Sequence, residues 1–108
     1  MSHGLGELEQ LVLLAILRRD GDAYGIAVQQ EIARYSDRKL TLGSVYSTLA
    51  RLEERGLVTS YEGAPTPTRG GRRKKLYKVQ PAGRSAVRAA LTALRALSRG
   101  LSPVLEQP

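Results

Sequence analysis

The hydrophobic pattern of the chain predicts three consecutive helices in its first half. Apolar residues recur three or four positions apart over residues 5–19, 23–35 and 41–55. The run Asp20-Gly21-Asp22 is typical of a helix end, and a polar stretch at 36–39 separates the second helix from the third. Thr41 can cap the third helix because its hydroxyl can accept a hydrogen bond from a free amide of the first turn.

The pattern changes to that of strands after Gly56, the residue expected to stop the third helix. Residues 57–62 and 75–79 are short runs rich in strand-forming residues. Residues 63–74 between them are rich in basic side chains, and their Gly70-Gly71 pair suits a hairpin turn that needs positive φ. We therefore expect two strands joined by a long, basic loop.

A last helix is predicted to begin at Pro81 and to close near Gly100 and Pro103. Its apolar residues recur at spacings of three and four and form a stripe that a chain this small has little means of covering. We therefore expect a homodimer formed by this helix of each copy, with the first helix as the second contributor to the interface. The expected interface residues are Leu8, Val12, Val87, Leu91, Leu94 and Leu97. The alternative is that the last helix folds back on its own domain.

These elements predict a mostly α-helical fold with a small β-hairpin, in the order of a winged helix-turn-helix. The expected division is a winged-helix DNA-binding domain at 5–80, a C-terminal dimerisation helix at 81–102 and a frayed tail at 103–108.

Charge is distributed unevenly along the chain. Residues 1–62 carry seven Lys/Arg and nine Asp/Glu, whereas residues 63–108 carry ten Lys/Arg and the single acid Glu106, within a total net charge of +7. A strongly basic second half indicates a polyanionic partner, with nucleic acid favoured over an anionic membrane. The chain has no cysteine and no apolar run long enough to span a bilayer, so we expect a cytoplasmic protein without a disulfide framework.

Two groups of residues could contact a DNA duplex. The start of the third helix can enter the major groove, and a basic hairpin tip can follow phosphates or enter a narrow minor groove. The expected contacts of the helix are Gly43, Ser44, Tyr46, Ser47, Thr48 and Arg51, and those of the wing are Arg69, Arg72, Arg73, Lys74 and Lys75. Taken singly, each feature also has a purely structural explanation. The start of the third helix can be a capped, solvated helix end, the basic tip can be a solvated loop, and Tyr46 can be a core residue.

The sequence argues against an enzyme. Its only histidine is His3, near the N-terminus; it has no cysteine nucleophile, and neither a P-loop nor a dinucleotide-binding glycine pattern is present. We expect no cofactor and no metal. Double-stranded DNA is the expected partner, and the alternative is a winged-helix module that binds RNA or another protein.

The chain resembles the PadR family of bacterial transcriptional regulators. The resemblance runs from about residue 5 to residue 83 and lies in an ordered set of stretches: 8–17 (LEQLVLLAIL), 23–25 (AYG), 43–49 (GSVYSTL), 51–58 (RLEERGLV) and 69–77 (RGGRRKKLY). It implies a winged-helix domain, a dimer formed by the C-terminal helix with help from the first helix, and repression at a palindromic operator. By position, the DNA-reading helix is 43–55, its typical tyrosine is Tyr46, and the wing is 63–74.

The single helix expected after the hairpin is like that of the short members of this family, and the chain differs from the family's pattern in two other respects. Gln80 stands where a threonine commonly precedes the last helix, which weakens that cap. The sequence also has no tryptophan, the residue with which some short members bind flat apolar ligands at the dimer interface, and this counts against a small-molecule effector of that kind.

Overall fold

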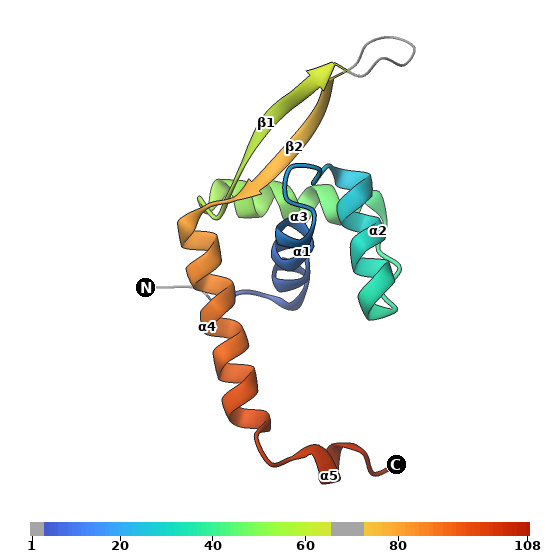
Figure 1. Cartoon of the computed structure of the whole chain (residues 1–108), viewed down its shortest axis with the longest axis vertical. Helices are drawn as coiled ribbons and strands as arrows, with labels where there is room; N and C mark the ends of the chain where they lie inside the picture. Colours follow the sequence, from blue (N-terminus) through green and yellow to red (C-terminus); the bar gives the residue numbers. More distant parts are fainter. Residues whose placement is uncertain (1–3, 66–72) are drawn as a thin grey trace.

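Three helices, a β-hairpin, a long helix and a short terminal helix follow one another along the chain (Figure 1). A computed structural model describes residues 4–65 and 73–108. Its elements are α1 (Glu7–Arg18), α2 (Gly25–Ser36), α3 (Leu42–Glu54), β1 (Val58–Pro65), β2 (Arg73–Val79), α4 (Pro81–Ser98) and α5 (Ser102–Leu105). The expected mostly helical fold with one antiparallel hairpin is confirmed. No helix of the described ranges is both long and apolar enough to cross a membrane.

Local residue chemistry sets the ends of the first three helices. Thr41 Oγ1 accepts a hydrogen bond from the Ser44 backbone N–H at 3.0 Å, which confirms the predicted cap of α3. Gly21 and Gly56 adopt positive φ just after α1 and α3, where a side chain would be strained. Asp37 also lies in the left-handed region and ends α2. The polar break at 36–39 is therefore a true helix boundary.

The hairpin is longer than the sequence predicts. β1 continues to Pro65 and β2 begins at Arg73, with a register irregularity between Glu62 and Pro65. Gly63 was assigned to the loop, but it lies in β1 close to the side chain of Leu76, where a larger residue would collide. The hairpin is also attached to the α1–α2 connection, since the Tyr77 N–H donates to the Ala23 carbonyl at 2.9 Å.

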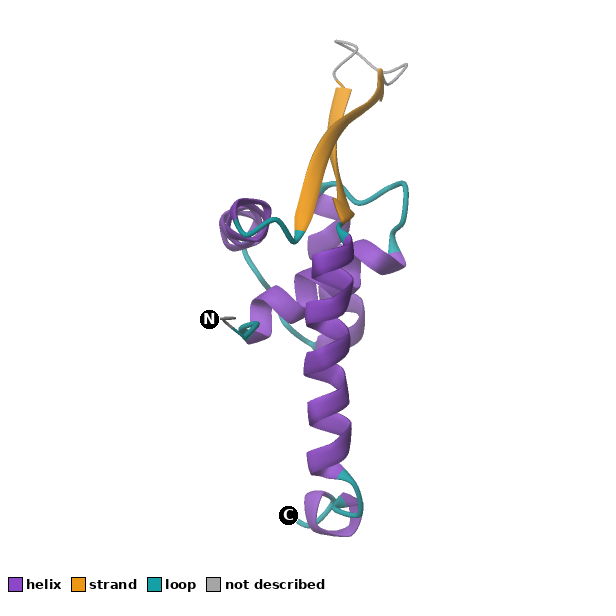
Figure 2. Ribbon diagram, turned by 90° about the vertical axis from the view of Figure 1, so that its left-hand side faces the viewer, coloured by secondary structure: helices purple, strands orange, loops and turns teal. Residues whose placement is uncertain are grey.

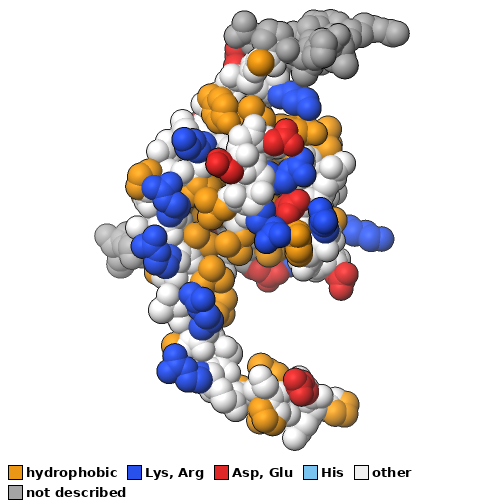
Figure 3. Space-filling view, in the orientation of Figure 1, with side chains coloured by type: hydrophobic (Ala, Val, Ile, Leu, Met, Phe, Trp, Pro, Cys, Tyr) orange, Lys and Arg blue, Asp and Glu red, His pale blue; other side chains and the backbone are white. Residues whose placement is uncertain are grey.

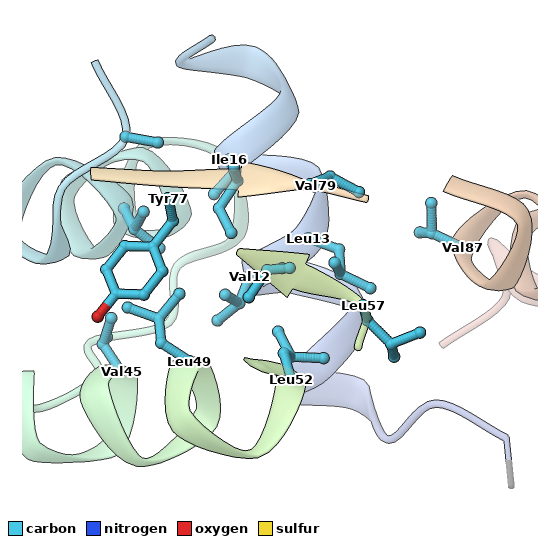
Figure 4. Close-up of a cluster of buried hydrophobic side chains, with 14 of the residues drawn as sticks. Val12, Leu13, Ile16, Val45, Leu49, Leu52, Leu57, Tyr77, Val79 and Val87 are labelled. Carbon is cyan, nitrogen blue, oxygen red and sulfur yellow. The ribbon is translucent and has the colours of Figure 1, made fainter. Parts of the chain in front are cut away.

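The core lies between α1, α2, α3, the base of the hairpin and the start of α4, and Figure 4 shows part of it. Two residues expected at a dimer interface belong to this core: Val12 is 0 % exposed and Val87 is 4 % exposed within one chain. The apolar surface of α1 is wide enough to serve the core as well as the outside, and the first turns of α4 pack on the body of the domain. The expectation for Val12 and Val87 is therefore corrected, because neither has surface left for a second copy.

The second half of α4 extends away from the domain (Figures 1 and 2). Leu94 is 55 % exposed and Leu97 is 77 % exposed, while Leu91 is partly buried against the core. Beyond Ser98 the chain turns at Gly100, which has a φ of 78°, and forms the short helix α5. This short helix spans the end of the expected dimerisation helix and the start of the expected tail at 103–108, and Pro103 lies in its first turn.

Close backbone contact fixes the direction in which α4 leaves the hairpin. The N-cap residue Gln80 makes no side-chain cap but donates its backbone N–H to the Leu57 carbonyl at 2.9 Å. One turn later, Gly83 is buried so close to the same carbonyl that a β-carbon would overlap it and would also lie 2.8 Å from Val79 Cγ1. Only glycine allows this approach.

We therefore expect Gly83→Ala to lower the free energy of unfolding by about 2–3 kcal/mol, because backbone atoms must move to admit one methyl group. Urea denaturation followed by circular dichroism measures the change. Gly43→Ala is the matched control, since its new β-carbon would meet nothing closer than Thr41 Oγ1 at 3.8 Å. Equal stability of the two variants would contradict the close contact at Gly83.

Candidate nucleic-acid interface

The outer face of α3 is formed mostly by small, polar side chains. Ser44, Ser47 and Arg51 follow one another along the helix and line a hollow of about 410 Å³, together with Thr41, Gly43, Thr48 and Leu8. Gly43, Ser47 and Arg51 are exposed, and Ser44 is partly exposed. Hydroxyl groups and a guanidinium are donors suited to phosphates and to base edges. Leu8 borders this hollow, so it lies beside α3.

Thr48 has a different place from the one expected. Its side chain is 1 % exposed, its hydroxyl donates to the Ser44 carbonyl at 2.8 Å, and Arg51 Nη2 donates to its Oγ1 at 3.2 Å. The hydroxyl is occupied within the helix and cannot reach a duplex directly. Thr48 instead orients the Arg51 side chain toward the hollow.

Tyr46 lies on the flank of α3 that faces the start of α2. Its side chain is 47 % exposed, and its ring passes directly over Gly25, the first residue of α2. A β-carbon at Gly25 would overlap the ring and would come within 2.6 Å of its Cε1 atom. The sequence leaves two roles open for Tyr46, a contact to DNA or a core residue. Both apply in part, since the ring packs on the domain and one side of it remains free.

The ends of α3 differ in charge. Its first turn contains no acidic residue, while its last turn contains the acidic Glu53 and Glu54 together with the basic Arg51. Glu53 Oε2 accepts a hydrogen bond from the Ser60 hydroxyl at 2.6 Å, which holds that carboxylate toward the hairpin. The positive end of the helix dipole at the N-terminus favours anions, so the start of α3 is the end suited to a phosphate backbone.

The described part of the wing presents lysines. Lys74 and Lys75 are exposed on β2, and the Lys74 ammonium lies 4.0 Å from the centre of the Tyr24 ring. Lys75 is opposite Glu62 in the strand register. The predicted wing residues Arg69 and Arg72 fall outside the described residues, and of Arg73 only the backbone is described, as the first residue of β2.

Tyr77 anchors the base of the wing. It is 5 % exposed, and burial is the main reason that the pKa of its phenol is raised above the ordinary value, despite the nearby positive charge of Lys75. The phenol therefore stays neutral at physiological pH. The contacts of Tyr24 and Ala23 with β2 were not anticipated from the sequence, because they join residues about fifty positions apart and have no periodic signal.

The hairpin and the free end of α4 point in opposite directions. In both ribbon views the hairpin rises from the domain and α4 descends in the opposite direction (Figures 1 and 2). Figure 1 shows α3 crossing near the base of the hairpin. The polar face of α3 and the lysines of β2 therefore belong to the part of the molecule remote from the free end of α4. A helix-turn-helix followed by a hairpin with this arrangement defines the class of winged-helix proteins.

Comparisons with known proteins identify the family within this class. Residues 13–89 match the model of the transcriptional regulator PadR-like family, and the chain belongs to that family. It is 35 % identical over 80 residues to a transcriptional regulator from Mycobacterium tuberculosis, Rv3488, a match that covers 74 % of this chain and 70 % of that protein.

Solved structures agree with this assignment at the level of the fold. A PadR family regulator from Clostridium difficile aligns with a TM-score of 0.75 at 22 % identity, covering 93 % of this chain and 99 % of that one. A PadR-like regulator from Bacillus cereus aligns with a TM-score of 0.74 at 19 % identity, covering 94 % and 93 % respectively. The resemblance noted from the sequence is thereby confirmed.

The contact of Tyr46 with Gly25 can be tested by a double-mutant cycle. We expect Gly25→Ala alone to lower the unfolding free energy by about 1–3 kcal/mol, because the methyl group displaces the ring. In a Tyr46→Ala background the same substitution should cost at least about 1 kcal/mol less. Thermal and urea unfolding of the four proteins measure the coupling, and additive effects would show that the ring does not cover Gly25.

Proposed function

We propose that this protein is a sequence-specific, double-stranded DNA-binding repressor that acts as a homodimer on a palindromic operator. The observation that carries the proposal is the open polar face of α3 beneath a lysine-bearing hairpin. Ser44, Ser47 and Arg51 would read the major groove, and the wing would contact the adjacent backbone. The proposal assigns the protein no catalytic activity and no cofactor, and it places the protein in the cytoplasm with the chromosome.

The uncovered half of α4 supports the homodimer. Leu94 and Leu97 are large apolar side chains on a helix that leaves its own domain, and burial against a second copy would remove them from water. A two-fold dimer would place two α3 helices about one helical turn of DNA apart, or a small multiple of it, which is why a palindromic operator is expected. Of the residues predicted for the interface, Leu8, Leu91, Leu94 and Leu97 remain in this proposal.

Arg51→Glu should lower operator affinity by on the order of 10- to 100-fold, because it replaces a cationic hydrogen-bond donor on the polar face of α3 with a negative charge that the phosphates repel. Fluorescence anisotropy with duplex fragments selected from genomic DNA measures the loss. Arg34→Glu is the matched control, since it makes the same charge change on an exposed residue of α2 outside this face.

Three results would contradict the DNA-binding part of the proposal. These are unchanged affinity of Arg51→Glu, equal loss in Arg34→Glu, and a preference for single-stranded RNA over duplex DNA in competition. Affinity should also fall by on the order of 10³-fold between 50 and 200 mM salt if several phosphates are neutralised by each dimer.

Leu94→Glu should give monomers that bind the operator weakly, because a carboxylate cannot be buried against an apolar partner surface without a large cost. Sedimentation velocity over a concentration series measures the oligomeric state. Thr92→Glu, which adds the same charge at an exposed position on another side of α4, should leave the dimer intact. A Leu94→Glu protein that sediments as the wild type does would refute the role given to this helix.

A further inference from the structure

Four arginines lie in a row along α4. Arg84, Arg88 and Arg95 belong to this helix, Arg99 is its C-cap residue, and all four are exposed. On a helix of 3.6 residues per turn their spacing places them within about 60° of arc and along about 22 Å of the axis. This set, here called the arginine stripe, lies about 110° around the axis from Leu94. The arginines and the apolar side chains of α4 therefore occupy different sides of the helix.

The chain itself does not neutralise the arginine stripe. α4 contains no acidic residue, and Glu106 is the only acid after residue 62. Within residues 4–65 and 73–108, Arg88, Arg95 and Arg99 form no ion pair, and Arg84 makes one long hydrogen bond of 3.4 Å to the Val79 carbonyl. The arginines of residues 18–55 differ, since most of them have a carboxylate partner: Arg18 with Glu31, Arg19 with Asp22, Arg38 with Glu7 and Arg55 with Glu9.

This clustering of positive charge opposes the stability of α4 unless an anion covers it. Like charges four residues apart on a helix repel each other, as in the pairs Arg84–Arg88 and Arg95–Arg99. A surface that serves solubility alone intersperses the two signs of charge. The space-filling view instead shows Lys and Arg side chains one below another along α4, with no acidic side chain between them (Figure 3). The stripe is therefore complementary to an extended polyanion.

The chemistry and spacing of the stripe favour a phosphate backbone as that polyanion. A guanidinium binds phosphate through two parallel hydrogen bonds. The length of the stripe, about 22 Å, spans about six successive phosphates of one DNA strand. Lys78 of β2 continues the stripe, since it lines a hollow of about 240 Å³ beside Arg84. Asp20 borders the same hollow, but among the described residues it forms no ion pair with either cation.

The far end of the stripe is remote from the polar face of α3. The molecule extends 54 Å along its longest axis, with the hairpin at one end and the free half of α4 toward the other (Figures 1 and 2). A duplex held by α3 and the wing therefore does not reach Arg95 and Arg99.

We propose that the arginine stripe binds the backbone of a second DNA duplex, so that the protein bridges two DNA segments. This inference rests on the proposed function, because α3 and the wing must hold the first duplex. A homodimer would present two stripes, and neighbouring segments of a bound chromosome are available at a high effective concentration. Contacts to phosphates carry no sequence information, so the second duplex can have any sequence.

Capture of a second duplex tests the bridge. Beads that carry an operator duplex, selected from genomic DNA, are loaded with the protein, washed and incubated with a fluorescent duplex of unrelated sequence. The wild type should retain the second duplex, and Arg88→Gln with Arg95→Gln should retain on the order of 10-fold less, because each dimer loses four cations. The slope of log affinity against log salt for the second duplex should become flatter by about 3.6. Fluorescence anisotropy should show unchanged affinity for the operator itself.

Two matched variants separate the stripe from the total charge and from the shape of its side chains. Ala89→Glu with Ala96→Glu lowers the net charge by the same amount at exposed positions on another side of α4, and should capture as the wild type does. Arg88→Lys with Arg95→Lys keeps the charges and should retain at least about half of the capture. A loss in the Ala89→Glu, Ala96→Glu protein equal to that of the glutamine variant would overturn the proposal.

The outcomes distinguish this inference from the proposed function. A wild type that prefers no genomic fragment overturns the proposed function, whereas binding of unrelated duplex that depends on Arg88 and Arg95 would still support the stripe. Selective operator binding without capture of a second duplex overturns the bridge alone. Equal capture by the wild type and the glutamine variant also overturns it. So does binding of phosphatidylglycerol vesicles in preference to unrelated duplex, if the glutamine variant loses that binding, because the partner of the stripe would then be a membrane surface.

Discussion

The burial of α1 is the constraint on which the rest of the molecule depends. This helix packs against α2, α3, α4 and β2, so it fixes the positions of those elements relative to one another. Its side chains divide into a set enclosed within the subunit, such as Leu13, and a set such as Leu17 that faces outward. One helix therefore supplies both the apolar contacts that stabilise the domain and an apolar surface outside it.

A polar link complements this apolar packing at the start of α1. Glu9 accepts a hydrogen bond from the Gly6 N–H at 2.8 Å and lies 2.9 Å from Arg55, just beyond α3. Burial alone would raise the pKa of Glu9, but these two partners outweigh it and lower the pKa below its ordinary value. The link therefore stabilises the fold above the pKa of an unfolded glutamate and is lost as the pH falls through the lowered value.

Most of the fold could be predicted from the sequence because its helices have a strong period and clear end signals. Thr41 and Gly56 delimit α3 by chemistry that is local to the chain. Contacts of single side chains were harder to predict. Periodicity shows that Val12 and Val87 are apolar, but it does not show that the same subunit encloses them. The polarity of Thr48 suggested an outward role, whereas its hydroxyl is satisfied inside α3.

The contact between Lys74 and Tyr24 has an electrostatic consequence. A carboxylate partner would orient an ammonium group but would also cancel its charge, whereas an aromatic face attracts the cation through its quadrupole and leaves the full unit charge in place. The wing can thus be held at a defined angle to the domain while its field still extends into the solvent. Lys74 can therefore attract a polyanion from a distance while its ammonium group is held in place by the Tyr24 ring.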